Sequence, residues 1–172
     1  EADYQAAMDN IVDISNDLAA TVKDADLVIE SVSESVEIKK AFYKELGEVL
    51  PDQTIVASNS STFVPSQLVK FTNFPERFLH MHFANHIWSH NVAEIVGTDQ
   101  TLPEVKDAVI KFARDIKMVP VVLNKENHGY VMNALLIPLL NAAQALWANG
   151  IADPHTIDED WMISNGSPMG PF

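Results

Sequence analysis

The first 124 residues alternate short apolar runs with longer amphipathic segments. Short apolar runs bounded by turn residues are typical of strands, and apolar residues spaced three or four apart are typical of helices. The pattern predicts strands at residues 11–15, 25–32, 54–58, 77–83, 92–97 and 118–123. It predicts helices at residues 1–10, 16–22, 35–50, 64–71 and 101–116, the second capped by the hydroxyl of Ser15. Strands that alternate with helices indicate an α/β fold built on a sheet.

The pattern changes after residue 124. Residues 129–149 form a long apolar stretch of helical character that contains Pro138, and a shorter helix is predicted near residues 157–163. A run of helices after a strand–helix alternation indicates a separate helical layer. We therefore expect an α/β sheet domain over residues 1–124 and the start of an α-helical domain over residues 125–172.

The composition narrows the class of protein. The chain has 172 residues, of which 47% are hydrophobic, and a formal net charge of −13. This charge argues against nucleic acids and anionic membranes, whose protein partners carry basic faces. The absence of cysteine excludes disulfides and thiolate chemistry. We expect a cytoplasmic protein with no signal peptide, and we expect the apolar run near residues 131–148 to be a buried helix because polar residues interrupt it.

Polar residues follow three of the predicted strands where each strand ends. Residues 25–58 read as a strand, a helix and a strand, so these two strands should be parallel with a right-handed crossover. Ser33-Glu34 follows the first of them, residues 59–61 follow the second, and Ala84-Asn85 follows the strand at residues 77–83. Loops after strands are often polar without any function. However, ligands of open α/β sheets bind at the carboxyl ends of the strands, which favours a site at this edge.

Four histidines, His80, His82, His86 and His90, occur within eleven residues. A zinc site would need three or four of them to converge at about 2.0–2.1 Å from the ion. His80 and His82 share one face of a strand while the other two lie in a loop, so we predict no metal site. Glu94 lies in the next predicted strand between Ala93 and Ile95, where a carboxylate is costly unless it is paired. A pair of His82 with Glu94 could act as a general base.

Four motifs in sequence order resemble the L-3-hydroxyacyl-CoA dehydrogenase family, which includes the 3-hydroxybutyryl-CoA dehydrogenases. The family's "ASN(T/S)S" is present at residues 57–61, and its "HFFNP" is similar to "HFAN" at residues 82–85. The "VE" that follows is matched by "AE" of "AEIVGT" at residues 93–98. The family's "PGFIVNR" resembles "HGYVMNA" at residues 128–134, and "GxPMGPF" matches residues 166–172. The resemblance implies a Rossmann-like sheet domain, incomplete at its N-terminus, followed by the start of a helical domain.

The resemblance also implies a reaction, the reversible oxidation of a 3-hydroxyacyl-CoA by NAD. By position, His82 would be the general base and Glu94 its partner. Ser61 would hydrogen-bond the reacting oxygen of the substrate, close to both the nicotinamide and the CoA thioester. Asn133 would complete the polar site from the helical domain.

Four positions match residues with which the family contacts NAD, namely Glu34, Lys39, Ser61 and Asn85. Lys39 also has a plain alternative role as a surface charge of its helix. The expected partners are an acyl-CoA substrate and a second copy of the chain, which would form a homodimer through the helical domain. A buried core helix explains the apolar pattern of residues 129–149 equally well.

The sequence departs from the family pattern in several places. No Gly-x-Gly-x-x-Gly occurs, so we expect an internal portion of a longer protein that binds NAD weakly by itself. His86, His128 and Ala134 replace two prolines and an arginine of the motifs, so a related dehydrogenase of a free hydroxy acid, of the gulonate or carnitine type, is an alternative. A non-catalytic, crystallin-like relative and a metal protein built on the histidines are the other two alternatives.

Overall fold

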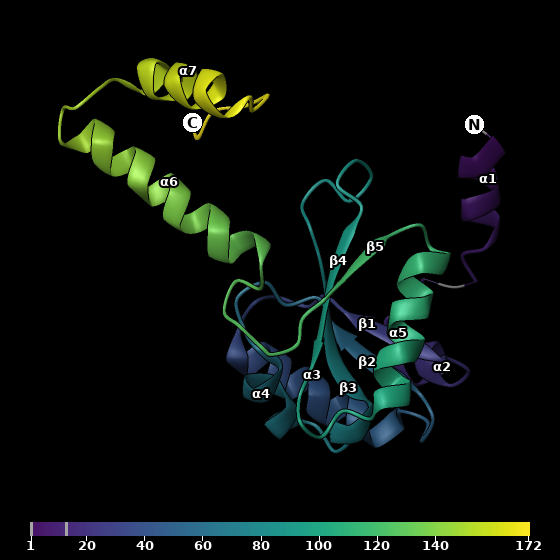
Figure 1. Ribbon diagram of the computed structural model, residues 1–172. Helices are drawn as coiled ribbons and strands as arrows, with labels where there is room; N and C mark the ends of the chain where they lie inside the picture. Colours follow the sequence, from purple (N-terminus) through teal and green to yellow (C-terminus); the bar gives the residue numbers. More distant parts are fainter. Residues whose placement is uncertain (1, 13) are drawn as a thin grey trace. The chain divides into compact units, whose positions relative to one another are not determined.

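A five-stranded sheet organises the first of two units, residues 1–126, and helices form the second, residues 127–172 (Figure 1). The computed structural model describes residues 2–12 and 14–172. The α-helices are α1 (Ala2–Asp9), α2 (Leu18–Val22), α3 (Val36–Val49), α4 (Pro65–Leu68), α5 (Pro103–Asp115), α6 (Met132–Ala148) and α7 (Pro154–Asn165). The strands are β1 (Leu27–Glu30), β2 (Ile55–Ser58), β3 (Phe78–Phe83), β4 (Val92–Gly97) and β5 (Val119–Val122), and two 3₁₀ turns are η1 (Val69–Phe71) and η2 (Pro75–Arg77).

The strands lie in their order along the chain, from β1 to β5. β1, β2 and β3 are parallel, which confirms the parallel pairing expected over residues 25–58. β4 is antiparallel to β3, and β5 is parallel to β4. The carboxyl ends of β1, β2 and β3 therefore share one edge of the sheet, and β4 begins at that same edge.

Helices cover both faces of the sheet, and the alternation of side chains along each strand divides the core in two. One face packs against α5, and its core includes Ala57, Leu79, Met81, Ala93, Ile95, Val105 and Val109. The other face packs against α3 and α4, and its core includes Tyr43, Leu46, Val56, Leu68, Phe74 and Phe78. The buried polar side chains of β2, β3 and β4 alternate with the α5-facing residues, so they belong to the second face, and they are Ser58, His80, His82 and Glu94.

The predicted strand at residues 11–15 is wrong for the described residues, and Asp13 lies outside them. Val12 is 99% exposed and Ile14 is 90% exposed, and neither belongs to a strand. A β-rich sequence forms a strand only where a neighbouring strand satisfies its backbone hydrogen bonds. The helix cap is also corrected: the carboxylate of Asp17, not the hydroxyl of Ser15, accepts from the backbone N–H of Ala20.

The second unit consists of α6 and α7. α6 begins at Met132 rather than at residue 129, because Gly129 and Tyr130 have positive φ angles that interrupt a helix. The expectation that this helix is buried is wrong in part, since Leu135 is 71% exposed and Trp147 is 55% exposed. α7 packs on one side of α6 and leaves the remainder of its apolar surface uncovered within this unit. Across residues 2–12 and 14–172, every helix falls short of the length and hydropathy that a bilayer-spanning helix requires.

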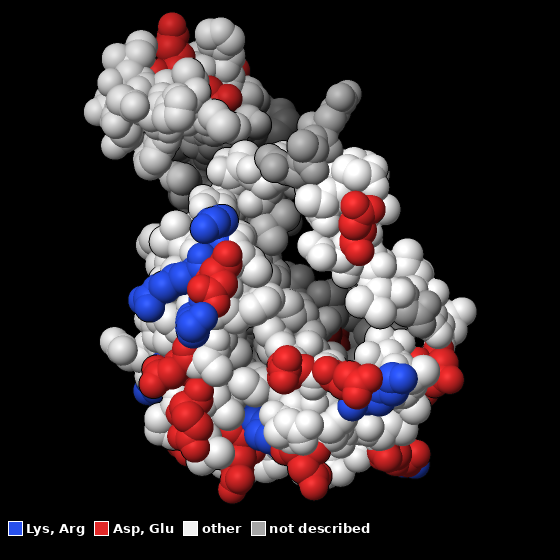
Figure 2. All heavy atoms as spheres, turned by 90° about the vertical axis from the view of Figure 1, so that its right-hand side faces the viewer, with Lys and Arg blue, Asp and Glu red and all other residues white. Residues whose placement is uncertain are grey.

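Most charged side chains lie on the surface. Figure 2 shows one face of the molecule, where acidic side chains are spread widely and basic ones gather in a few places, as the net charge of −13 leads one to expect. Glu30, Lys39 and Glu94 are exceptions, because each is at most 3% exposed. Buried charges are costly unless they are paired, so these three positions require partners nearby.

His80 is fully buried in β3, where its ring lies edge-on to that of Phe78. Burial, and to a lesser degree the charge of Lys39, lowers the pKa of His80 from its ordinary value of 6.5 to about 3. In the unfolded chain the same imidazole takes up a proton as the pH falls through 6.5. The folded state does not, so His80 costs stability at acidic pH and costs none at pH 8.

We expect the variant His80→Gln to flatten the pH dependence of stability. Between pH 7.5 and pH 5, the free energy of unfolding should fall by about 2 kcal/mol more in the wild type than in the variant. Urea denaturation of the full-length natural protein at these pH values measures the difference. Parallel stability curves for the two proteins from pH 7.5 to pH 5 would show that His80 titrates normally.

Candidate active site

His82 and Glu94 face each other across the antiparallel ladder of β3 and β4. Residues directly opposite in such a ladder project from the same face of the sheet. The Nδ1 atom of His82 lies 3.0 Å from Oε2 of Glu94, and both side chains are 4% exposed. Because a carboxylate only accepts hydrogen bonds, Nδ1 carries the hydrogen, and Nε2 keeps its lone pair in the neutral ring. The two residues are thus brought together as the sequence suggested, while their catalytic roles stay a prediction.

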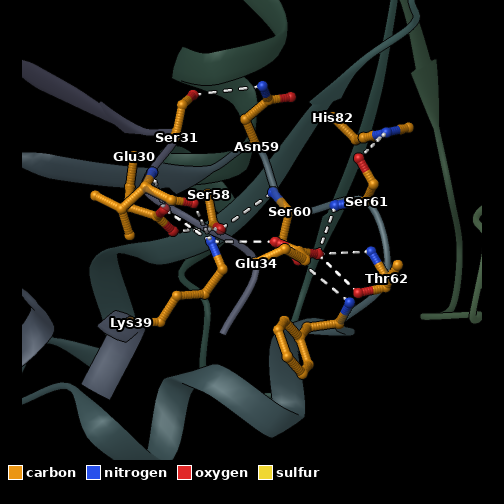
Figure 3. Close-up of polar contacts among 12 residues, drawn as sticks. Glu30, Ser31, Glu34, Lys39, Ser58, Asn59, Ser60, Ser61, Thr62 and His82 are labelled. Atoms are coloured by element: carbon orange, nitrogen blue, oxygen red, sulfur yellow. Dashed lines mark hydrogen bonds and ion pairs between the residues drawn. The ribbon is translucent and has the colours of Figure 1, made fainter. Parts of the chain in front are cut away.

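Ser61 reaches His82 from the turn that follows β2. Its Oγ lies 3.1 Å from Nε2 of His82 (Figure 3), while Glu94 binds the other ring nitrogen, Nδ1. The neighbouring Asn59 holds this turn to the end of β3, since its Oδ1 accepts from the backbone N–H of Phe83 at 2.9 Å. Ser61, His82 and Glu94 therefore form a continuous hydrogen-bonded series at the edge of the sheet.

Glu34 fixes the turn from the other side. Its Oε1 accepts from the hydroxyl of Ser60 at 2.5 Å, from the backbone N–H of Ser61 at 3.0 Å, and from the backbone N–H and hydroxyl of Thr62 at 2.8 Å each. Partial burial would raise the pKa of Glu34, but the hydrogen bonds from Ser60 and Thr62 and the charge of Lys39 outweigh it and lower the pKa to about 2. Glu34 is therefore a carboxylate over the whole physiological range and a strong acceptor for the turn.

Lys39 lies inside the protein rather than on the helix surface. Its side chain is 1% exposed, and its Nζ lies 2.8 Å from Oε1 of Glu30 and 3.3 Å from Oε2 of Glu34. The plain alternative of a solvated surface charge is thereby wrong. The ammonium of Lys39 is already paired with two carboxylates. Its contact with NAD stays a prediction.

Two of the predicted site residues lie apart from this series. Asn85 is exposed in the loop between β3 and β4, where its carbonyl oxygen lies 3.2 Å from Nδ1 of His90. Asn133 is the second residue of α6 and so belongs to the second unit. The roles of Asn85 in cofactor binding and of Asn133 in the polar site stay predictions.

The other histidines of the cluster do not converge on one point. His86 and His90 lie in the loop with their ring centroids 6.1 Å apart, while His80 is buried in β3. Among residues 2–12 and 14–172, no group of three or more His, Asp and Glu side chains could hold a metal ion. The described structure therefore gives the alternative of a metal protein no support.

Sequence reasoning missed Glu30, which the structure places beside the turn of Ser61, and it included Asn59 only as one of the polar residues after a strand. Glu30 is the acidic last residue of the apolar run that forms β1, and it is 1% exposed. Glu94 was noticed because a carboxylate in a buried strand needs a partner. The same reasoning applies to Glu30. No individual role was predicted for Asn59, because an asparagine after a strand is ordinary turn chemistry.

Comparison with known protein families covers nearly the whole chain. Residues 1–127 match the family described as "3-hydroxyacyl-CoA dehydrogenase, NAD binding domain", and residues 129–172 match "3-hydroxyacyl-CoA dehydrogenase, C-terminal domain". The chain is 34% identical over 151 residues to a 3-hydroxybutyryl-CoA dehydrogenase of Clostridioides difficile, covering 88% of the chain and 53% of that protein. It is 32% identical over 161 residues to a mitochondrial hydroxyacyl-coenzyme A dehydrogenase of Sus scrofa, covering 94% and 51%.

Solved structures of similar proteins also include dehydrogenases of this family. A diketoreductase described for dual catalysis of dicarbonyl compounds is 56% identical, with a TM-score of 0.90, covering 92% of this chain and 56% of that one. The (S)-3-hydroxybutyryl-CoA dehydrogenase of Ralstonia eutropha is 28% identical, with a TM-score of 0.86, covering 91% and 55%. The chain spans about half the length of the relatives it matches. With a Rossmann-type sheet unit, a helical unit and both family matches in the expected order, the chain belongs to the 3-hydroxyacyl-CoA dehydrogenase family.

Proposed function

We propose that the natural protein containing this chain transfers a hydride reversibly between NAD and the 3-hydroxyl carbon of a 3-hydroxyacyl-type substrate. The series Ser61–His82–Glu94 carries this proposal. In the oxidative direction, Nε2 of His82 accepts the hydroxyl proton of the substrate, and Glu94 stabilises the imidazolium that forms. The hydroxyl of Ser61 hydrogen-bonds the reacting oxygen and orients it toward Nε2.

A bound NAD would supply the acceptor for the hydride of the carbinol carbon. The residues present fit the nicotinamide-ribose end of this cofactor. The carboxyl ends of parallel strands are where dinucleotides lie, and Glu34 is there with a side chain that is 33% exposed, able to accept from a ribose hydroxyl. The exposed amide of Asn85 is at the same edge. None of the six glycines forms the Gly-x-Gly-x-x-Gly turn that cradles a pyrophosphate.

Replacing the proposed base should abolish most of the activity. In the full-length protein we expect His82→Ala to lower kcat/KM by about 10²–10⁴-fold, the usual contribution of a general base. Glu94→Gln should also lower kcat/KM strongly, because an amide can donate to Nδ1 and so favour the wrong tautomer. Steady-state rates of NADH consumption with a 3-oxo substrate measure both effects.

The exposed His155 of α7 provides the control, and His155→Ala should keep the wild-type rate. Unchanged turnover in His82→Ala would show that His82 is not the base. A wild-type protein without turnover on any 3-oxo or 3-hydroxy substrate would instead favour the crystallin-like alternative.

A second substrate class has a specific observation in its favour. The chain shares more identity with the diketoreductase, 56%, than with the 3-hydroxybutyryl-CoA dehydrogenase of Clostridioides difficile, 34%. The loop after His82 also departs from the family motif at His86, and it carries Trp88 with 81% of its surface exposed. A dicarbonyl compound without CoA is therefore the second candidate, close to the free hydroxy acid considered from the sequence.

Substrate comparison separates the two classes. We expect the full-length protein with NADH to give a higher kcat/KM for a dicarbonyl compound without CoA than for acetoacetyl-CoA. The residues around the reacting oxygen would serve either substrate. Specificity would therefore depend on the loop at residues 84–91, which departs from the family motif. A higher kcat/KM for acetoacetyl-CoA would contradict this expectation and indicate that a CoA thioester is the preferred substrate.

We also propose that the protein forms a homodimer through its helical unit. The exposed apolar residues of α6 support this, among them Leu135, Ile137 and Trp147, since large apolar patches usually mark interfaces. Sedimentation equilibrium should give twice the monomer mass, and Leu135→Glu should shift the protein toward monomer. A wild-type protein that sediments as a monomer at micromolar concentration would contradict the proposal.

A further inference from the structure

Beneath the candidate site lies a buried carboxylate that no part of the reaction uses. Glu30, the last residue of β1, is 1% exposed, and its two oxygens receive four hydrogen bonds. Oε1 accepts from the backbone N–H of Val32 and from Nζ of Lys39, both at 2.8 Å. Oε2 accepts from the hydroxyl of Tyr43 at 2.5 Å and from that of Ser58 at 2.7 Å. Glu30 is therefore held by donors from the segment after β1, from β2 and from α3.

The sequence arranges these partners by simple spacing. Lys39 and Tyr43 are four residues apart on α3, so both side chains lie on the same face of that helix. Ser58 is the direct neighbour of Glu30 in the parallel register of β1 and β2. Burial, with a smaller contribution from Glu30, raises the pKa of Tyr43, so its hydroxyl stays protonated and donates.

Lys39 connects this buried group to the turn of the site. Its ammonium bridges Glu30 and Glu34, and Glu34 in turn binds the backbone N–H groups of Ser61 and Thr62 (Figure 3). Ser61 then meets Nε2 of His82 at 3.1 Å. An unbroken series of polar contacts thus runs from Glu30 to the proposed base.

Stability alone is a weak explanation for such a network. Buried ionic groups can often be exchanged for apolar residues at no loss of stability, because desolvation offsets their attraction. This network ends on the backbone of the residue that would contact the reacting oxygen. Reaction rates are sensitive to such placement, since a displacement of about 1 Å can cost about 10²-fold.

We infer that Glu30, held by Tyr43 and Ser58, is a positioning residue for the hydride-transfer reaction, acting through Lys39 and Glu34 on Ser61. This inference rests on the proposed function. Glu30 touches neither substrate nor cofactor, so its effect is on the orientation of Ser61 and His82. Losing it should slow the chemical step while leaving the binding of the 3-oxo substrate nearly intact.

The test uses Glu30→Gln and Tyr43→Phe in the full-length natural protein. Glu30→Gln removes the charge that holds Lys39, and Tyr43→Phe removes one donor to Glu30 while keeping the ring that packs on Phe78. At saturating NADH, we expect Glu30→Gln to lower kcat about 10- to 100-fold and Tyr43→Phe to lower it about threefold or more, with the KM for the 3-oxo substrate within about threefold of the wild type. The isotope effect on kcat with NADH deuterated at the transferred hydrogen should increase.

Thr54→Val is the matched control. Thr54 is fully buried beside the opposite end of β2, and its hydroxyl donates to the carbonyl of Ala25 at 2.6 Å. Its loss should lower the melting temperature and leave kcat of the folded enzyme unchanged. If Glu30→Gln does not fold, the kcat, KM and isotope effect of Tyr43→Phe test the inference instead.

Two results overturn the inference in different ways. A wild-type enzyme that turns over, with kcat of the decisive variant within twofold of it, would refute the positioning role alone. A wild-type protein without any dehydrogenase activity would refute the proposed function and the positioning role together.

Discussion

A carboxylate buried in a sheet needs a hydrogen-bond donor beside it, and this constraint shapes the whole candidate site. Glu94 is 3% exposed near the start of β4, and Glu30 is 1% exposed at the end of β1. Leaving either one unpaired would cost several kcal/mol, so the fold has to bring donors to both. The donors are His82 for Glu94, and Lys39, Tyr43 and Ser58 for Glu30. The polar side chains of the site are therefore located by the same energetics that bury the core.

The reversal of strand direction at β4 makes the first of these pairings possible. His82 lies near the carboxyl end of β3, and the antiparallel ladder places Glu94 directly opposite, near the start of β4. A parallel β4 would need a long crossover after β3 instead of a short loop. The loop of residues 84–91 is thus both the connection that allows this register and the segment exposed beside the proposed base.

The sequence predicts this arrangement as far as local chemistry determines it. The period-two pattern of β3 and the cost of an unpaired Glu94 indicate that His82 and Glu94 can meet if their strands are neighbours, and the family motifs point to the same pair. The direction of β4 and the burial of Lys39 depend on long-range pairing, which spacing along α3 does not reveal. The segment at residues 11–15 shows the opposite case, since its β-rich residues have no described strand beside them. Local pattern thus indicates which residues favour burial, whereas neighbouring strands decide whether they obtain it.

The charges at the site also indicate which part of a ligand it can receive. Glu30, Glu34 and Glu94 contribute three carboxylates, and Lys39, the cation that lies among them, is already paired with two. Such a site repels phosphates and suits groups that donate hydrogen bonds, such as the hydroxyls of a ribose or of a 3-hydroxy substrate. The phosphates of a dinucleotide therefore need a separate backbone cradle of the kind that glycine-rich turns provide. In the proposed reaction, these residues would therefore face the reacting end of the cofactor and substrate rather than the phosphates.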